Sequence, residues 1–390
     1  MRIVDVGYIY DKTLATEDEL LEQHYTTVGW AEALAKEGIE VIVLKRFFKD
    51  SSFKKNNVQY FFVKDSYDNS FRSWQIPFRL FKKIAALQPD VIHLHHLSLS
   101  LQTFILRFFL KKNTAIVIQH HGGQTPKGIK KKIHDWFNLI ADAFFFTTVE
   151  QGKEWFPNKK LRNKILPVME GSTFFNYNKR HDETELYYQN KNEAREISSM
   201  NGDPVFLWVG RLDENKDPLT ILDGFEELFQ KKYSAAKLYM MYSHDKLIGD
   251  VKNKIENSEI LTQKVQLLGR IPHHEVQSYY NSADYFVLGS HYEGSGYALS
   301  EALRCGCVPI VTDIPSFRMM TENAQLGALW EPGNKNSFIQ AAISAIDKPL
   351  KEEAEKCIDF FKKHLSFDAI AEQAIKHYQK TIEVRNKKKR

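Results

Sequence analysis

Two successive series of short apolar segments, separated by helical segments, most strongly limit the folds open to this chain. Strands of the first series are predicted at RIVDVGYI, EVIVLKRF, DVIHLHH and TAIVIQHH, with a helical segment ending at Gly38 between the first two. A second series runs through PVFLWVG, KLYMMY, KVQLLG, DYFVLGS and CVPIVTD. Apolar strands that alternate with helices form parallel sheets covered on both faces. The sequence therefore predicts an α/β fold with two doubly wound, Rossmann-like domains facing each other across a cleft.

The length of the chain agrees with more than one domain, because 390 residues exceed one ordinary core. The first series of strands ends before residues 167–172, which we take as the boundary. We predict an N-terminal domain at 1–170, a C-terminal domain at 171–365, and a final helix with a basic tail at 366–390 that packs back toward the N-terminal domain. A polar stretch at 176–203 is predicted to be flexible.

Composition and cysteine content indicate the compartment. The chain is 43% apolar and 26% charged, as expected for a globular protein. The longest mostly apolar run, at 97–110, is interrupted by polar residues and shorter than the roughly 20 residues that span a bilayer. The start of the chain contains Asp5 and no cleavage-like site, which predicts a strand instead of a signal peptide. Three cysteines suit a reducing compartment, so we expect a cytoplasmic location.

Positive charge is concentrated in the first domain. The net charge is +5, and residues 1–170 contain 25 Lys+Arg against 18 Asp+Glu. The charges form aromatic-flanked patches at 78–83, 107–112 and 126–137. One interpretation is peripheral contact with an anionic membrane surface at its inner face, or with a polyanionic acceptor. The other is solvated helix faces with buried aromatics. We predict no nucleic-acid partner.

Two basic residues follow the first strand of the second domain. In PVFLWVGRLDENKDPLTIL, Gly210 and Arg211 stand at the strand end, and Lys216 precedes a helix that Pro218 is suited to begin. A guanidinium and an ammonium near a helix N-terminus match the charge-assisted donors that a diphosphate needs. The alternative is a surface loop with ordinary charges.

The segment EGSGYALSEALRCG, at 293–306, contains two carboxylates around a glycine-rich turn. It predicts a loop and then a helix, whose first backbone amides, at 295–297, are able to meet a phosphate. A diphosphate would repel carboxylates, so Glu293 and Glu301 make sense if they accept hydrogen bonds from sugar hydroxyls. Sugars on both sides of a diphosphate indicate a nucleotide sugar. The alternative for Glu301 is a charge on the helix surface.

These motifs resemble the donor domain of the retaining glycosyltransferases of family 4, which have the GT-B fold. Their Glu-x7-Glu pair matches Glu293 and Glu301, their Arg and Lys match Arg211 and Lys216, and the resemblance covers nearly the whole second domain. The motifs and the resemblance together predict these donor-binding residues: Gly210, Arg211, Lys216, Gly269, Ile271, Glu293, Gly294, Ser295, Gly296, Tyr297 and Glu301, with Gly7 from the first domain.

The first domain is more loosely similar to the family, through DVIHLHH and QHHGGQTP. This resemblance implies that His121 is the active-site histidine and that His95, Gly122 and Gly123 bind the acceptor. Family members often have a Gly-Gly pair near the end of the first strand, where this chain has only Gly7.

The activity implied is transfer of a sugar to an acceptor hydroxyl with retention at the anomeric carbon. Arg211, Lys216 and the helix amides would stabilise the leaving diphosphate. Glu301 would hold the ribose diol and Glu293 the donor sugar, while His121 would contact the sugar through its ring or its backbone carbonyl. The chain has no Asp-x-Asp triplet, so we expect no metal and no cofactor beyond the nucleotide-sugar donor.

Two residue groups raise the alternative of a metal site. His93 and His95 share one face of a strand, but no carboxylate partner is evident from sequence, which favours a structural or acceptor-lining role. Cys305 and Cys307 are interpreted as small buried thiols.

Two other functions remain open at this point. A nucleotide-sugar epimerase would act on the donor alone, and a partner subunit would bind the sugar nucleotide without catalysis. For a transferase, a carbohydrate or lipid-linked acceptor in polysaccharide, glycolipid or cell-envelope synthesis is expected.

Overall fold

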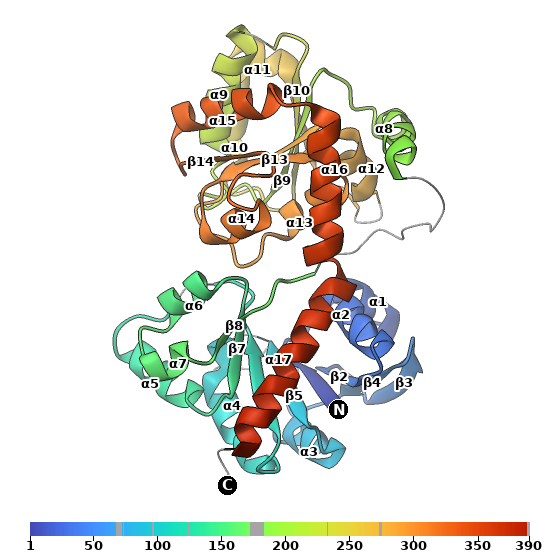
Figure 1. Cartoon of the computed structure of the whole chain (residues 1–390), viewed down its shortest axis with the longest axis vertical. Coiled ribbons are helices and arrows are strands. Elements are labelled where there is room, and N and C mark those ends of the chain that lie inside the picture. Colours follow the sequence, from blue (N-terminus) through green and yellow to red (C-terminus); the bar gives the residue numbers. More distant parts are fainter. Residues whose placement is uncertain are drawn as a thin grey trace. The chain divides into compact units, whose positions relative to one another are not determined.

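The computed structural model describes residues 1–67, 72, 74–95, 97–123, 125–171, 183–231, 233–272 and 275–387. The chain forms two compact units (Figure 1). The first unit contains Met1–Ser172 and Ser366–Arg390, and the second contains Thr173–Leu365. The predicted basic end at 388–390 lies outside the described residues.

The first unit is built on one sheet with the order β3-β4-β2-β1-β5-β6-β7-β8. Its strands are β1 (Arg2–Gly7), β2 (Glu40–Arg46), β3 (Ser51–Lys55), β4 (Val58–Val63), β5 (Val91–His95), β6 (Ala115–Gln119), β7 (Ala143–Phe146) and β8 (Ile165–Pro167). Neighbouring strands pair in parallel, except β3 and β4. The chain changes direction across the sheet between β1 and β5, and ligands of such sheets bind beyond strand ends at this reversal.

Helices cover the first sheet. They are α1 (Glu17–Gln23), α2 (Tyr25–Lys36), α3 (Phe78–Leu87), α4 (Ser100–Leu106), α5 (Gly128–Asn138), α6 (Val149–Trp155), α7 (Lys159–Arg162) and α17 (Phe367–Lys387), with short turns at Leu97–Leu99 and Arg107–Phe109. Helix α17 packs on α2 and β6 (Figure 1). The ring of Phe367 fills the space beside Gly29 and Gly171, where a Cβ atom would collide with it.

The second unit has a six-stranded sheet with the order β11-β10-β9-β12-β13-β14, and its described pairings are parallel. Its strands are β9 (Val205–Gly210), β10 (Lys237–Tyr242), β11 (Val265–Gly269), β12 (Tyr285–Leu288), β13 (Val308–Thr312) and β14 (Ala328–Trp330). Its helices are α8 (Glu183–Ser198), α9 (Pro218–Lys231), α10 (Ile248–Glu256), α11 (Glu259–Lys264), α12 (Val276–Ser282), α13 (Tyr297–Arg304), α14 (Pro315–Met320), α15 (Lys335–Ile346) and α16 (Leu350–Phe360), with a π-helical turn at Phe361–Leu365. The reversal of strand order lies between β9 and β12.

The two sheets confirm the predicted α/β, doubly wound class, and two local features differ from the sequence analysis. The sequence analysis did not predict the β3–β4 hairpin, whose turn at Asn56 and Asn57 has positive φ values of 48° and 64°. Of the polar stretch predicted to be flexible, residues 176–182 lie outside the described residues, and the rest includes α8, which packs against α12. Arg195 of α8 donates to the Asp284 carboxylate over 2.8 Å, an interaction invisible in a linear pattern. Within the described part of the chain, no helix is long and apolar enough to cross a membrane.

Candidate active site

The predicted basic residues and the first predicted carboxylate of the second unit follow neighbouring strands. Arg211 and Lys216 come after β9, and Glu293 comes after β12. Parallel strands end at the same edge of a sheet, so the order of β9 and β12 brings their following loops together. The strand order also reverses between β9 and β12, and the carboxyl ends of the strands at such a reversal are the expected position of a ligand site.

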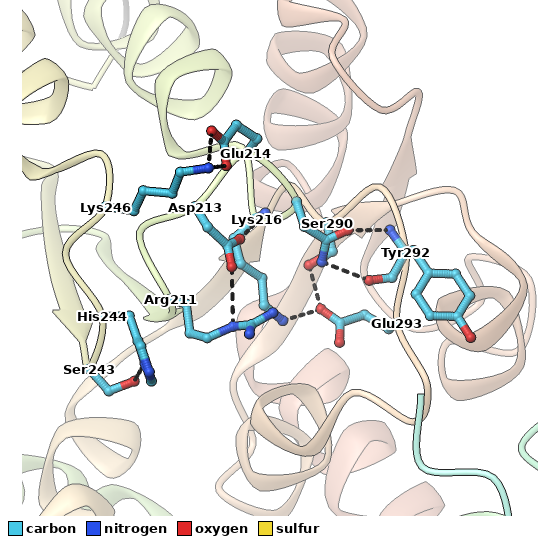
Figure 2. A network of polar contacts seen from close by, with 11 residues as sticks. Arg211, Asp213, Glu214, Lys216, Ser243, His244, Lys246, Ser290, Tyr292 and Glu293 are labelled. Atoms are coloured by element: carbon cyan, nitrogen blue, oxygen red, sulfur yellow. Dashed lines mark hydrogen bonds and ion pairs between the residues drawn. The ribbon is translucent and has the colours of Figure 1, made fainter. Parts of the chain in front are cut away.

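An ion pair joins the two loops. The Lys216 ammonium contacts Glu293 Oε1, and the Ser290 hydroxyl donates to the same oxygen over 2.6 Å (Figure 2). The side chains of Lys216 and Glu293 are only 13% and 12% exposed. The structure therefore brings together a residue predicted to bind the diphosphate and a residue predicted to bind the sugar, and their charges neutralise each other.

Asn215 fixes the two loops relative to one another, and the sequence analysis missed it. Its side-chain amide donates to Tyr292 O over 2.9 Å, and Tyr292 N donates to Asn215 Oδ1 over 3.1 Å. His291 N donates to Asn215 O over 2.8 Å. A Cβ atom at Gly289 would lie 2.9 Å from Asp217 O, so only glycine permits this approach. In the sequence, the sign of this role was the position of Asn215 between Arg211 and Lys216.

Arg211 is the more open of the two cations. Its Nε lies 3.2 Å from Asp213 Oδ2, and its side chain is 53% exposed. Figure 2 shows the side chain of Arg211 in the same network view as His244 and the Lys246–Glu214 ion pair. At the preceding Gly210, a Cβ atom would lie 3.3 Å from the Trp208 ring, so the absence of a side chain lets the strand end pass this ring closely.

Gly296 forms the N-cap of α13 in the left-handed conformation, with φ of +80°. A Cβ atom there would lie 2.8 Å from the Phe317 ring, so both backbone and space require glycine. Gly294 and Ser295 before it are buried, and Tyr297 begins the helix. The predicted amide segment therefore leads directly into a helix N-terminus, the partially positive end of the helix.

Glu301 is buried within α13, so the interpretation as a helix-surface charge is wrong. The Tyr280 hydroxyl donates to Glu301 Oε2 over 2.9 Å. Burial, together with the Glu301 carboxylate, raises the pKa of Tyr280 well above its ordinary value, so this hydroxyl keeps its proton. Gly269 and Ile271 lie at and after the end of β11, with β10 and β9 between them and β12. The structure does not connect them directly with Glu293.

The candidate residues of the first unit gather at the ends of β1, β5 and β6. His95 Nε2 lies 2.9 Å from Asp5 Oδ2, and His95 Nδ1 lies 2.7 Å from His121 Nε2. His121 Nδ1 forms an ion pair with Glu170 Oε1. Neither Asp5 nor Glu170 was predicted as a site residue, although Asp5 interrupts an otherwise apolar strand.

The glycines at the first unit's candidate site are needed for different reasons, two for their backbone conformation and one for the space it leaves. Gly122 and Gly123 follow His121 with φ of 94° and 108°, so the loop after β6 depends on their backbone freedom. Gly7 at the end of β1 does not adopt a positive φ. A Cβ atom at Gly7 would lie 3.2 Å from Lys45 Nζ, so the missing side chain leaves room for the buried lysine.

Ligand atoms of Asp5, His93 and His95 all lie within 4.8 Å of one another. The carboxylate partner that was not evident from the sequence is Asp5, because β1 lies beside β5. Hydrogen bonds account for the arrangement: His95 bonds to Asp5, and His93 Nδ1 bonds to the Tyr378 hydroxyl. The expectation of a metal-free site stays a prediction. All three cysteines are buried and free.

Two sequence families match most of this chain. Residues 189–364 match the family described as Glycosyl transferases group 1, and residues 24–153 match Glycosyltransferase Family 4.

Curated relatives are similar over different lengths. The chain is 27% identical over 154 residues to the UDP-Gal:alpha-D-GlcNAc-diphosphoundecaprenol alpha-1,3-galactosyltransferase of Escherichia coli, a match that covers 39% of each protein. It is 25% identical over 302 residues to the capsular polysaccharide biosynthesis glycosyltransferase CapH of Staphylococcus aureus, covering 76% of each.

A solved structure agrees in fold. The crystal structure of a glycosyltransferase from Rickettsia africae has a TM-score of 0.72 at 16% identity, with 98% of each chain covered. This likeness, over both units, confirms the predicted GT-B fold.

Proposed function

This chain belongs to the group 1, family 4 glycosyltransferases, and we propose that it transfers a sugar from a nucleoside diphosphate to an acceptor hydroxyl with retention at the anomeric carbon. The observation that carries this proposal is the convergence of Lys216, Glu293 and the N-terminus of α13 at the reversal of the second sheet. A cation and a helix N-terminus suit phosphates, and a carboxylate suits sugar hydroxyls.

Donor binding exchanges the partners of the central ion pair. The diphosphate takes the Lys216 ammonium and the sugar hydroxyls take the Glu293 carboxylate, so neither charge is left buried without a partner. Arg211, which is more exposed, supplies the second cation. As the glycosidic bond breaks, negative charge grows on the diphosphate, and these fixed donors stabilise it.

Glu301 binds the ribose diol. The Tyr280 hydroxyl donates to Oε2 and so fixes the orientation of the carboxylate. Both oxygens of the Glu301 carboxylate are acceptors, and a vicinal diol offers two donors. Because Arg211 and Lys216 supply the positive charge at the diphosphate, donor binding needs no metal ion.

The acceptor is a carbohydrate, carried on a lipid or within a polysaccharide of the cell envelope. The names of the two curated relatives support this class, one with a diphosphoundecaprenol acceptor and one in capsular polysaccharide synthesis. In this proposal, His121 and the two glycines after it contact the acceptor.

Contact with a membrane is proposed through α5. Ile129, Ile133 and Trp136 recur at helical spacing on α5, and they are 69%, 49% and 57% exposed. The Trp136 ring packs 5.1 Å from that of Phe104, which in turn contacts the 73% exposed Phe108. The alternative with buried aromatics is therefore wrong for these residues.

Exposed Lys130 and Lys132 lie between the apolar positions of α5. An apolar stripe flanked by lysines fits an anionic bilayer interface. The enzyme then works at the inner face of the cytoplasmic membrane, close to a lipid-linked acceptor.

The test begins with thermal unfolding of the purified protein in UDP, GDP, ADP and their sugar conjugates, each with and without EDTA. One nucleotide should raise the melting temperature selectively, and EDTA should not change that shift, because a ligand that binds the folded state stabilises it by mass action. Lys216→Ala should abolish the shift while it leaves the ligand-free melting temperature near that of the wild type.

Turnover then decides between functions. A transferase releases nucleoside diphosphate only when an acceptor is present, whereas an epimerase converts the donor alone. The absence of any nucleotide-dependent shift, or an unchanged shift in Lys216→Ala, would contradict the proposed donor site.

A further inference from the structure

Four titratable side chains form one continuous chain in the first unit. Its order is Asp5, His95, His121 and Glu170, joined by the contacts of 2.9 Å and 2.7 Å and by the ion pair described above. The carboxylates at its ends are 1% and 3% exposed, and the His121 side chain is 22% exposed. Of the four side chains, that of His121 is the most exposed, followed by that of His95 at 12%.

Strand register explains why Asp5 and His95 meet. Side chains alternate between the faces of a strand, so Asp5 of β1 and His93 of β5, which are register partners, share a face with His95. Lys45 of β2 lies on the same face, and α17 and α2 pack on this side, where Tyr378 bonds to His93. The polar groups are thus enclosed between the sheet and two helices.

Counting hydrogens limits the charge of the chain to two distributions. Three contacts join the four groups, and each contact needs one hydrogen between its two heavy atoms. Two neutral rings bring only two hydrogens, so one contact would set two lone pairs against each other. Two protonated rings bring four hydrogens, so in the contact between the rings two N–H groups would point at each other. If both carboxylates are ionised, the two rings carry all three hydrogens, which is one imidazolium charge for the pair. If Asp5 carries the third hydrogen, both rings are neutral. Burial raises the pKa of Asp5, whereas the nearby Lys45 and His121 lower it.

The surroundings of His121 favour the distribution with an imidazolium. Burial alone would lower the pKa of His121, but the Glu170 carboxylate outweighs it and raises the pKa above its ordinary value, with a smaller effect from Asp5. Burial lowers the pKa of Lys45 to about 8, which leaves it mostly protonated at neutral pH. Two carboxylates are then balanced by one lysine and one imidazolium. The other titratable groups that face this chain are His93 and Tyr378, with His24 acting on Asp5 at longer range.

We propose that Asp5, His95 and Glu170 are positioning residues that hold His121 in one orientation and give the His95–His121 pair a single shared imidazolium proton. This inference rests on the proposed function for its catalytic consequence. A ring held in one orientation with its proton in place donates a fixed hydrogen bond to the sugar that it contacts, at no cost of reorganisation during the reaction. It also changes the role of His95, from contacting the acceptor to orienting His121.

The charge is tested without any substrate. In full-length protein labelled with ¹⁵N-histidine, His95→Gln and His121→Gln assign the two rings in the nitrogen spectrum. At pH 7.5, where an ordinary histidine with a pKa of about 6.5 is neutral, the wild-type pair should show one imidazolium distributed over both rings. Two neutral rings at this pH would overturn the proposal.

The positioning role is tested by kinetics. Glu170→Gln should lower kcat by about ten- to hundredfold and change the donor KM by less than about twofold. His95→Gln, whose amide both donates and accepts, should retain more activity than His95→Leu. Asp142→Asn is the matched control, because Asp142 is also a buried, ion-paired carboxylate of this unit but pairs with Arg385. Its kcat should equal that of the wild type.

Two outcomes separate the proposals. A kcat of Glu170→Gln within about twofold of the wild type would overturn the positioning role. A wild-type protein inert toward every nucleotide sugar would instead refute the proposed function, and the nitrogen spectrum would still decide the shared proton.

Discussion

Lys216 and Glu293, 77 positions apart in the sequence, neutralise each other across the loops that follow β9 and β12. The two residues were predicted to bind different parts of one donor, and without a ligand each is the partner of the other. In the proposed function, donor binding therefore competes with this interaction inside the protein.

Glu293→Gln should separate nucleotide affinity from turnover. Removal of the carboxylate frees Lys216, so the nucleoside diphosphate product should bind about three- to tenfold more tightly, which corresponds to about 0.6 to 1.4 kcal/mol. Turnover should fall, because the amide keeps one acceptor oxygen but replaces the other with a donor and removes the negative charge that strengthens hydrogen bonds from the donor sugar. Calorimetric titration and steady-state kinetics measure the two effects.

The control for this variant is Glu214→Gln, which breaks the exposed Lys246–Glu214 ion pair of the same region. It should leave both quantities unchanged, since exposed pairs contribute little. Weaker product binding in Glu293→Gln would contradict the competition between ligand and carboxylate.

Gly296→Ala should destabilise the second unit and impair donor binding together. An alanine at φ of +80° is strained, and its Cβ would meet Phe317 at 2.8 Å, so we expect a loss of about 2 to 4 kcal/mol. Gly38→Ala is the matched control, because Gly38 has φ of +78° with open space around it, and strain alone costs about 1 to 2 kcal/mol. Urea unfolding and nucleotide titration check the pair. Equal losses in both variants would show that Phe317 does not restrict the cap.

The α5 surface should bind anionic vesicles. Wild-type protein should sediment with phosphatidylcholine vesicles that contain phosphatidylglycerol, and less so at high salt. Lys130→Glu and Lys132→Glu should each weaken binding by at least about 1 kcal/mol per lysine. Trp136→Ser should weaken binding at all salt concentrations.

Trp74→Ser is the control for α5, since Trp74 is a 64% exposed tryptophan elsewhere in the same unit. Equal losses in Trp74→Ser and Trp136→Ser, or no sedimentation of the wild type, would contradict this surface. A concentration-dependent dimer that Trp136→Ser abolishes would assign the face to a second copy of the chain.

Acid should destabilise the first unit through His93. Burial, with help from His95, lowers the pKa of His93 to about 3, whereas in the unfolded chain it is about 6.5. The unfolded state binds more protons between these values, so stability is complete above pH 6.5 and falls as the pH drops toward 3. At pH 4.5 the loss should be about 2 to 3 kcal/mol.

His93→Gln does not titrate in this range, so its free energy of unfolding should depend less on pH than that of the wild type. Urea unfolding at pH 6.5, 5.5 and 4.5 measures both. Parallel pH profiles would remove His93 as the source of acid sensitivity.

The sequence predicted that the residues of the proposed donor site follow the ends of strands, because apolar strands can be recognised in the sequence. Arg211, Lys216 and Glu293 follow apolar segments, and the order of parallel strands brings such segments to one edge. Which side chains bond to one another depends on rotamers and loop paths. Asn215 and Tyr280 were therefore not predicted, and neither was the bond between Lys216 and Glu293.

The polar chain of the first unit was hidden for a different reason. Asp5 and His95 are 90 positions apart, and they meet only because β1 and β5 are neighbours in register. The sequence showed each residue as polar inside an apolar strand, but not the strand order that joins them. Glu170 lies after β8, outside any recognisable motif.

The position of α17 has a consequence for how the protein is made. The second unit, Thr173–Leu365, is inserted in the chain between two parts of the first, and Phe367 at the start of α17 packs against Gly29 and Gly171. On the ribosome, the first 172 residues emerge with the surface that receives α17 still uncovered. His93 has no Tyr378 to bond until the whole insertion has been translated. The domain that begins first is therefore completed last, and chaperones that bind nascent apolar surface have nearly 200 residues of synthesis in which to act.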